Sequence, residues 1–341
     1  MMNFSFGKSK SFALDLGNNN TVLTDTERIL LSEPSYIVLN ENRSVNAVGE
    51  AAYNIFEKSH EALHPIKPLR GGVIADYQSA DKMIRSLVDK VYTKRFWTSG
   101  FDTIITGVPY QTTAVERRAF RETLDQFNAS KTLMLYEPLA AAVGMGLNIR
   151  EPEGKLIVDI GGGITEVAII SLSGVTTFQS LKVAGDTFDE AIRDHFRKEH
   201  NLLIGIRTAE QLKKAIGGVH TQIENVPQNI FVRGKSLAEG IPMRKEVSYH
   251  EMVSVLTKPF LEIEAGIINT LQHCPPELAA DIYGSGIYLT GGGALLLGIK
   301  ERLEKTISLP VNIDPNALTS VSKGISAALS DQKKFKSVLM A

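Results

Sequence analysis

Two stretches of the sequence, Phe12–Leu23 and Leu156–Ile170, decide its fold. They read FALDLGNNNTVL and LIVDIGGGITEVAII, so each contains an apolar run, then Asp-x-Gly-x-x-x-Thr, then a second apolar run. Short apolar runs on either side of a Gly/Asn turn predict a β-hairpin. Two equivalent hairpins in one chain predict two related halves that face each other.

The aspartates of the two hairpins, Asp15 and Asp159, indicate a nucleotide site. A carboxylate at the end of a buried strand is costly unless it faces a metal ion, directly or through water. The turn after it offers backbone N–H groups to phosphate oxygens. If the motif occurred only once, the Asp would more simply be explained as a residue that caps its own turn. Two copies with matching spacing instead favour a clamp on a nucleoside triphosphate and its Mg²⁺.

A third glycine turn, Gly291–Gly293, follows a predicted strand over Gly286–Thr290. We expect this turn to open a helix over Ala294–Lys305, a geometry that brings backbone N–H groups close to a ligand. A simple tight turn that binds no ligand would explain the same residues. The third glycine turn is therefore weak evidence alone, but together with the two hairpins it supports one shared site.

Composition excludes several classes of protein. The chain has 341 residues, 43% of them hydrophobic and 22% charged, with a net charge of −1. These values predict roughly two folded domains rather than a disordered chain, and no general attraction to nucleic acid. No segment approaches the length of a membrane span. The single cysteine, Cys274, excludes an intramolecular disulfide and a cysteine zinc site, and we interpret its neighbour His273 as structural.

The rest of the chain alternates predicted strands with predicted helices, which indicates an α/β fold. Thr112 or Thr113 together with Glu116 has the spacing of a helix capping box. Strands are expected over Ile29–Leu39, Thr103–Val108 and Leu133–Leu135, and helices over Asp81–Tyr92, Val115–Phe127, Leu139–Gly146, Asp189–His200, Thr208–Gly217 and Glu251–Leu271.

Further stretches carry a resemblance that runs nearly end to end. They are Pro68–Tyr77 (PLRGGVIADY), Val115–Ala119 (VERRA), Tyr136–Ala142 (YEPLAAA), Val158–Val167, Ala184–Asp186, Arg207–Glu210 and Pro275–Gly293. With these motifs the chain resembles the superfamily of actin, sugar-kinase and heat-shock-chaperone ATPases, and within it the MreB family of bacterial actin homologues.

The resemblance implies an α/β, actin-like ATPase fold. Two related, ribonuclease H-like halves with small inserted subdomains would surround a central nucleotide cleft. Subdomain IA would comprise residues 1–38, 72–151 and 318–341, and subdomain IB residues 39–71. Subdomain IIA would comprise residues 152–187 and 247–317, and subdomain IIB residues 188–246.

The resemblance also implies roles for individual residues. Asp15 and Asp159 would hold Mg²⁺ through water, and Glu137 and Asp159 are the expected catalytic residues. Glu137 would orient or activate the water that attacks the γ-phosphate; its alternative role is to cap the helix at Pro138, and the two roles are compatible. Glu210 and Lys213 would contact the ribose and adenine, their alternative being an exposed i,i+3 ion pair. The expected contacts to ATP or ADP are Gly17, Asn18, Asn19, Asn20, Gly161, Gly162, Gly163, Gly185, Asp186, Glu210, Lys213, Gly291, Gly292 and Gly293.

Several positions depart from the family pattern. The turn after Pro109 reads Tyr110-Gln111-Thr112, where the family commonly has small residues and an Ile. Asn18 stands where the first turn usually has Thr, and Ile164 and Ile206 replace a Thr and a Glu. The two isoleucines remove polar groups near the nucleotide. Glu137 and Asp159 remain, so we predict ATP hydrolysis.

A basic and aromatic segment over Lys90–Phe101 predicts membrane contact. Phe96, Trp97 and Phe101 would insert into the lipid interface, while Lys90, Lys94 and Arg95 face anionic headgroups. Composition alone allows equally that these rings pack on the core, and the resemblance favours the membrane loop. Phe4 and Phe6 are a second candidate contact.

The implied function is that of a cytoskeletal ATPase. It would bind further copies of itself, the inner membrane surface, and proteins of cell-wall elongation or other membrane proteins, and it would not bind nucleic acid. It would form antiparallel double filaments on the cytoplasmic face of the membrane and organise cell shape and cell-wall synthesis, with slow hydrolysis coupled to polymerisation. The helix near Val115–Phe127 is the candidate contact between protofilaments. A paralogue with weak hydrolysis and a scaffold or motility role, a non-polymerising kinase of the same superfamily, and a chaperone-like binding module are the alternatives.

Overall fold

The computed structural model describes residues 10–58, 61–92 and 100–341, and it divides into two compact units. Unit 1 comprises residues 1–148 and 319–341, and unit 2 comprises residues 149–318. The division into four subdomains stays a prediction.

Unit 1 is built on a five-stranded sheet with the order β10-β9-β1-β2-β3. The first hairpin lies at its centre, because β1 pairs antiparallel with β2 and parallel with β9. β9 is buried along its whole length, as expected for a strand covered on both faces. The strands are β1 (Ser11–Leu16), β2 (Asn20–Thr24), β3 (Ile29–Pro34), β9 (Thr103–Val108) and β10 (Lys131–Tyr136).

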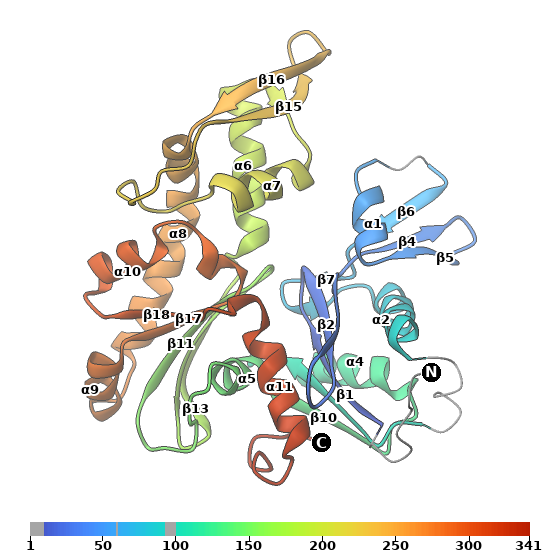
Figure 1. Cartoon of the computed structure of the whole chain (residues 1–341), viewed down its shortest axis with the longest axis vertical. Helices are drawn as coiled ribbons and strands as arrows, with labels where there is room; N and C mark the ends of the chain where they lie inside the picture. The colour runs from blue at the N-terminus through green and yellow to red at the C-terminus, as the bar shows by residue number, and fades with distance from the viewer. Residues whose placement is uncertain (1–9, 59–60, 93–99) are drawn as a thin grey trace, which may run out of the picture. The chain divides into compact units, whose positions relative to one another are not determined.

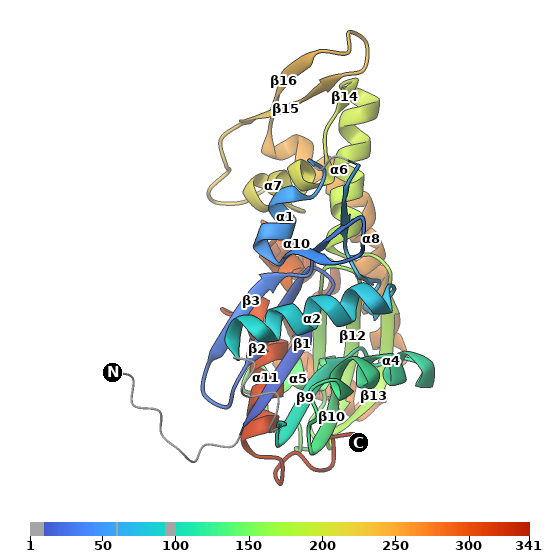
Figure 2. The ribbon, with the colours of Figure 1, turned by 90° about the vertical axis from the view of Figure 1, so that its right-hand side faces the viewer.

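Among the described residues, two pairs of helices cover this sheet, on opposite faces (Figures 1 and 2). One pair is α2 (Tyr77–Val91) and α4 (Ala114–Asp125), and the other is α5 (Glu137–Gly144) and α11 (Ser320–Ser330). Glycine allows α5 and α11 to approach closely: a Cβ on Gly144 would lie 1.8 Å from the Ser320 carbonyl oxygen, and one on Gly324 would lie 1.8 Å from that of Ala140. The backbone of α5 therefore packs directly on the backbone of α11.

Unit 1 also contains a smaller sheet with the order β5-β4-β6, together with the short helix α1. Tyr36, Val38 and Ala52 form the buried part of a separate small core there. The elements are β4 (Ile37–Asn40), β5 (Val45–Val48), α1 (Glu50–Ile55), β6 (Leu63–Ile66) and the two-stranded β7 (Leu69–Arg70) and β8 (Val73–Ile74).

Unit 2 repeats the arrangement of unit 1. Its sheet has the order β13-β12-β11-β17-β18, with the second hairpin, β11 and β12, at the centre and parallel strands beside β11. Each central strand thus pairs antiparallel with the strand that follows it in the chain and parallel with the strand on its other side, which confirms the prediction of two related halves. The strands are β11 (Lys155–Ile160), β12 (Thr165–Ser171), β13 (Gly174–Leu181), β17 (Ile287–Thr290) and β18 (Val311–Ile313).

Helices and a second, three-stranded sheet surround this core; β15 and β16 form a hairpin near the far end of α6 (Figure 1). The helices are α6 (Gly185–Glu199), α7 (Ile206–Ile216), α8 (Tyr249–Gln272), α9 (Pro276–Ser285) and α10 (Ile299–Ile307), the short 3₁₀ turns are η1 (Gly292–Leu295) and η2 (Ala317–Thr319), and the remaining strands are β14 (Leu202–Leu203), β15 (Ile230–Ser236) and β16 (Pro242–Val247).

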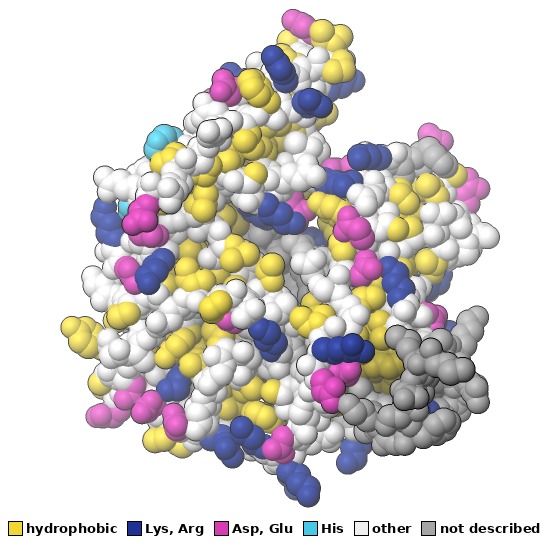
Figure 3. Space-filling model, in the orientation of Figure 1, with side chains coloured by type: hydrophobic (Ala, Val, Ile, Leu, Met, Phe, Trp, Pro, Cys, Tyr) yellow, Lys and Arg dark blue, Asp and Glu magenta, His cyan; other side chains and the backbone are white. Residues whose placement is uncertain are grey.

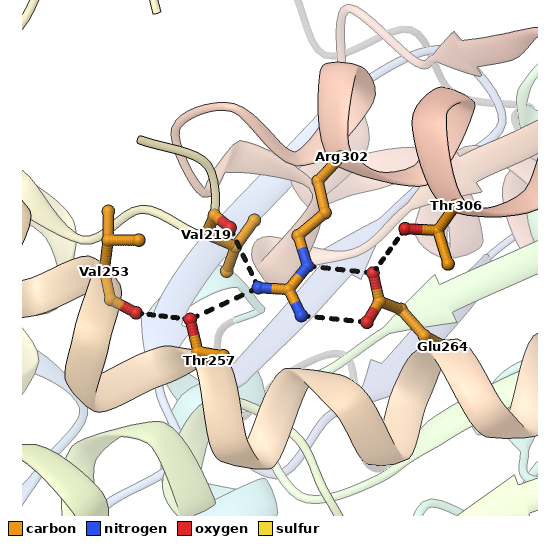
Figure 4. A network of polar contacts seen from close by, with 6 residues as sticks. All are labelled: Val219, Val253, Thr257, Glu264, Arg302 and Thr306. Carbon is orange, nitrogen blue, oxygen red and sulfur yellow. Dashed lines mark hydrogen bonds and ion pairs between the residues drawn. The ribbon is translucent and has the colours of Figure 1, made fainter. Parts of the chain in front are cut away.

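A buried ion pair joins α10 to α8 (Figure 4). The Arg302 guanidinium donates to both carboxylate oxygens of Glu264 at 2.8 Å. It also donates to the Val219 carbonyl oxygen at 2.9 Å, while Thr306 donates to Glu264 at 3.2 Å. A buried charge pair is tolerated when further hydrogen bonds satisfy both groups, as they do here. This network fixes α10 on the long helix.

The local signals for helices are largely confirmed. Thr113 caps α4, and its reciprocal hydrogen bonds with Glu116 complete the predicted capping box. Pro259 lies inside α8 without ending it. Two predictions are wrong. The segment Ile29–Leu39 divides into β3 and β4, and the helix expected over Ala294–Lys305 begins only at Ile299, after η1 and a left-handed Gly298.

The described surface carries charges of both signs, interspersed over the face drawn in Figure 3, in keeping with the low net charge. Among the described residues, no helix is long and apolar enough to cross a bilayer.

Candidate functional site

The first glycine turn links β1 to β2. The Gly17 N–H donates to the Asn20 carbonyl oxygen at 3.0 Å and closes the turn. Asn18 is buried, and its side-chain oxygen lies 3.5 Å from the Gly72 nitrogen within unit 1. Oδ1 of Asn19 is buried and has no hydrogen-bond partner among the described residues. The turn therefore keeps one polar atom for a donor outside the chain, such as a water on a bound cation.

Glu137 lies at the same edge of the unit 1 sheet as Asp15. Asp15 is near the carboxyl end of β1, and Glu137 follows the carboxyl end of β10 as the first residue of α5. Only β9 lies between these two parallel strands, so the two residues start from strands about 10 Å apart. Pro138 follows Glu137 in the first turn, as predicted.

The second glycine turn has the geometry of the first. The Gly161 N–H donates to the Ile164 carbonyl oxygen at 3.0 Å, as Gly17 donates to Asn20. The threonine after each turn is fully buried: Thr165 donates to the Val183 carbonyl oxygen at 2.6 Å, and Thr21 lies 2.9 Å from the hydroxyl of Ser35. The Asp-x-Gly-x-x-x-Thr repeat is thus a repeated turn structure.

The start of α6 is attached to this second turn. The N–H groups of Gly185 and Asp186 donate to the carbonyl oxygens of Gly161 and Gly162 at 3.1 and 2.8 Å. Lys213 of α7 donates to the Gly185 carbonyl oxygen at 2.8 Å and lies 2.9 Å from both carboxylate oxygens of Asp189. Burial raises the pKa of Asp189 to about 7, and the Lys213 ammonium opposes that rise.

The partners of Glu210 and Lys213 differ from the alternative considered above. Glu210 pairs with Lys214 at 2.7 Å, four residues along α7, and Lys213 pairs with Asp189 on α6. The alternative interpretation, an i,i+3 ion pair between Glu210 and Lys213, is therefore wrong. Nothing in these contacts tests the predicted role of either residue toward ribose or adenine.

The third glycine segment contacts Asp159 directly. Thr290, the last residue of β17, is paired with Asp159 in the parallel ladder. Gly291 follows with a φ of 81°, and a Cβ there would lie 2.3 Å from Oδ1 of Asp159 and 2.4 Å from the Ile160 carbonyl oxygen. Only glycine fits this position. The turn starts η1 rather than a long helix.

Asp159 has the electrostatic character expected of a cation ligand. Burial raises its pKa to about 6, because the carboxylate loses hydration and no charged group among the described residues compensates for that loss. A divalent cation near this carboxylate would supply that charge. The donor set of carboxylates, backbone N–H groups and carbonyls is the one that Mg²⁺ with a polyphosphate requires, so these residues fit Mg-ATP or Mg-ADP.

Both glycine turns lie at carboxyl ends of parallel strands, where open α/β sheets bind ligands. In unit 1 the edge carries Gly17 to Asn20, Asp15 and Glu137. In unit 2 it brings together Asp159, Gly161 to Gly163, Gly185, Asp186 and Gly291 to Gly293.

One residue of the predicted membrane loop is assigned wrongly. Phe101 is only 2% exposed, and its ring packs edge-on against Phe12 and Tyr92, with centroids 4.9 and 5.2 Å apart. It belongs to the core of unit 1. Lys90 donates to Glu33 at 2.8 Å. The other predicted contacts, Phe4, Phe6, Lys94, Arg95, Phe96 and Trp97, lie outside the described residues.

One cluster of ligand-type residues escaped the sequence analysis. His195, His200 and Glu251 come together in unit 2. His195 and His200 are close in sequence, but Glu251 comes from a different helix, so no local motif indicates all three.

Comparison with known proteins places this geometry in a family. A family model described as MreB/Mbl protein matches residues 9–337. The chain belongs to the MreB/Mbl family. The cell shape-determining protein MreB of Escherichia coli strain K12 is 38% identical over 327 residues, which cover 94% of this chain and 93% of that protein. The cell shape-determining protein Mbl of Bacillus subtilis strain 168 is 33% identical over 329 residues, covering 96% and 98%.

Solved structures agree with this assignment. MreB5 of Spiroplasma citri bound to AMPPNP superposes with a TM-score of 0.91 at 33% identity, covering 97% of this chain and 99% of that one. The MamK double helical filament has a TM-score of 0.77 at 18% identity, which supports the fold alone. The actin-like fold that the family resemblance implied is confirmed.

Proposed function

We propose that this MreB/Mbl-family chain is an actin-like cytoskeletal ATPase that binds Mg-ATP or Mg-ADP and assembles into filaments. The repeated turn geometry carries this proposal: two Asp-x-Gly turns, each at the carboxyl edge of an equivalent sheet, in a chain that superposes nearly end to end on MreB5 bound to AMPPNP. Structures of that relative with AMPPNP and with ADP support binding of both nucleotide states. Membership of the MreB/Mbl family favours a cytoskeletal protein over a sugar kinase.

Each group of residues has a role in this proposal. The backbone N–H groups of the glycine turns bind phosphate oxygens, and Asp15 and Asp159 hold the cation through water. Bound Mg²⁺ would neutralise phosphate charge as the bond to the γ-phosphate breaks. Glu137 orients the attacking water and accepts its proton, since no covalent step is required of the protein.

Hydrolysis is expected to be slow and coupled to polymerisation. Ile164 and Ile206 place hydrocarbon where polar groups would contact the nucleotide, and the buried side chain of Asn18 is directed toward Gly72 inside unit 1. The two isoleucines reduce the number of polar groups available to the phosphates. The scaffold paralogue with weak hydrolysis is therefore the second candidate.

Phosphate release by the purified chain with Mg-ATP tests the ATPase. We expect Glu137→Ala to lower the rate by roughly a hundredfold or more, the usual contribution of a positioned general base. Glu239→Ala removes an exposed carboxylate in the β15–β16 turn and is the matched control. Equal rates for wild type and Glu137→Ala would reject the catalytic assignment.

Membrane association remains part of the proposal on sequence grounds. We propose that the filaments are antiparallel and double, lie on the cytoplasmic face of the inner membrane, and organise cell shape together with wall-synthesis or other membrane proteins. Phe96 and Trp97 are the membrane contacts, now without Phe101. Wild type should sediment with anionic liposomes while a Phe96→Ser/Trp97→Ser variant stays in solution, and equal sedimentation of the two would reject the contact.

A further inference from the structure

A cluster of two histidines and one glutamate lies apart from the glycine turns of unit 2. His195 is in the last turns of α6, His200 caps the carboxyl end of that helix, and Glu251 is in the first turn of α8. Their ligand-type atoms all lie within 4.8 Å of one another. The glycine turn that contacts α6 meets the opposite end of that helix, at Gly185.

The three side chains converge on one point. Oε1 of Glu251 lies 2.7 Å from Nε2 of His195 and 2.5 Å from Nε2 of His200. Each imidazole thus presents the same nitrogen to a single carboxylate oxygen. A metal ion bound here would take the space between the two rings and the carboxylate, in place of any proton that these nitrogens share with it.

The surrounding structure fixes the three groups before any ion arrives. Phe196 is fully buried, and its ring centroid lies 5.8 Å from that of His195 and 5.3 Å from that of His200. The two imidazoles meet edge-on, with centroids 5.3 Å apart and an interplanar angle of 89°. The Ser248 hydroxyl accepts from the Glu251 N–H at 3.2 Å, which fixes the start of α8. A site ordered in this way loses little entropy on binding.

From this convergence we propose that His195, His200 and Glu251 bind one Zn²⁺ ion, which joins the carboxyl end of α6 to the amino end of α8. Two imidazole nitrogens and one carboxylate are a zinc ligand set that leaves the fourth position to water. Around a tetrahedral ion with bonds of 2.0–2.2 Å, ligand atoms lie about 3.3 Å apart, so the carboxylate oxygen has to withdraw by less than about 1 Å.

The chemistry and exposure of the cluster suit zinc better than magnesium. Nitrogen ligands favour Zn²⁺, Co²⁺ and Ni²⁺, whereas Mg²⁺ requires oxygen ligands in an octahedral arrangement. The side chains are 20%, 16% and 22% exposed, so solvent reaches the site. The ion would stabilise unit 2 by binding the folded state alone.

The test uses full-length, tag-free, nucleotide-free protein stripped of metal. Zn²⁺ binding is measured by competition with a chromophoric chelator, in excess Mg²⁺. We expect one Zn²⁺ per chain, an upward shift of the unfolding temperature by several degrees, and binding at least about tenfold weaker in both His200→Ala and Glu251→Gln. His273→Ala is the matched control, because it removes an exposed histidine beside Cys274 and should leave binding unchanged.

A second measurement does not depend on the folding of any variant. Co²⁺ added to wild type should give the intense visible absorption of a tetrahedral site, and one equivalent of Zn²⁺ should abolish it. The proposal is overturned if wild type takes up no Zn²⁺ in excess Mg²⁺, if the Co²⁺ spectrum is octahedral, or if His273→Ala alone loses the ion.

Discussion

Replacement of Gly324 by alanine tests how tightly α11 holds the helix that begins at Glu137. In an open helix this change is favourable by about 1 kcal/mol, because alanine has the higher helix propensity. In α11 the new Cβ would lie 1.8 Å from the Ala140 carbonyl oxygen and 2.5 Å from its carbon. A normal contact requires the two helices to separate by roughly 1.5 Å.

The obstacle is backbone, so no side-chain rotation relieves it. Overpacking of this kind costs typically 1–3 kcal/mol and occasionally more. We expect a net loss of about 2 kcal/mol or more in the free energy of unfolding, seen as a drop of about 4–8 °C in the melting temperature of a unit of this size. Separation of the helices also displaces Glu137, so phosphate release should fall at temperatures where the variant is folded.

The matched control is Gly284→Ala in α9, where a Cβ meets nothing within 4 Å. The same substitution should there be neutral or stabilising by up to about 1 kcal/mol. Thermal and urea unfolding of both variants decide the matter. A Gly324→Ala protein as stable as wild type, or one no less stable than Gly284→Ala, would refute the close packing of α5 on α11.

Three further outcomes follow from the described contacts. Gly291→Ala should lower the melting temperature and weaken binding of a fluorescent ATP analogue by at least about tenfold, since its Cβ collides with Asp159 at a positive φ. Gly292→Ala, whose Cβ has only Leu318 at 3.5 Å, should keep the melting temperature of wild type, and equal melting temperatures of the two variants would contradict the collision. Phe101→Ala should cost about 3–5 kcal/mol in urea unfolding through loss of core packing, without weakening liposome sedimentation of the folded protein. The pKa of Asp189 is near 3.8 in the unfolded chain and about 7 in the folded protein, so between these pH values the folded state binds a proton that the unfolded state has lost. As pH rises through that window, wild type should therefore lose stability relative to Asp189→Asn, by at most about 4 kcal/mol. A stability difference that does not change with pH would contradict the raised pKa.

The hairpins and most helices were predictable because their signals are local. The turn at Gly17 and the turn at Gly161 carry the same spacing in the sequence and close the same hydrogen bond in the structure. The capping box of Thr113 is likewise set within one turn of helix. Patterns of this kind depend on neighbours a few residues apart.

The failures arose where distant residues decide. Phe101 lies beside a basic and aromatic segment in the sequence, yet its ring is buried by Phe12 and Phe127, which come from distant parts of the chain. The apolar residues after Gly293 suggested an immediate helix, but Gly298 in the left-handed region delays it. The cluster of His195, His200 and Glu251 exists only because α6 ends near the start of α8.

Electron microscopy of the purified chain with ATP, ADP and a non-hydrolysable ATP analogue tests the central claim most directly. A cytoskeletal ATPase should form filaments with ATP and with the analogue, without any sugar substrate, and fewer with ADP. Folded protein that binds nucleotide but forms no filaments in any of the three states, at any concentration tested, would contradict the assignment.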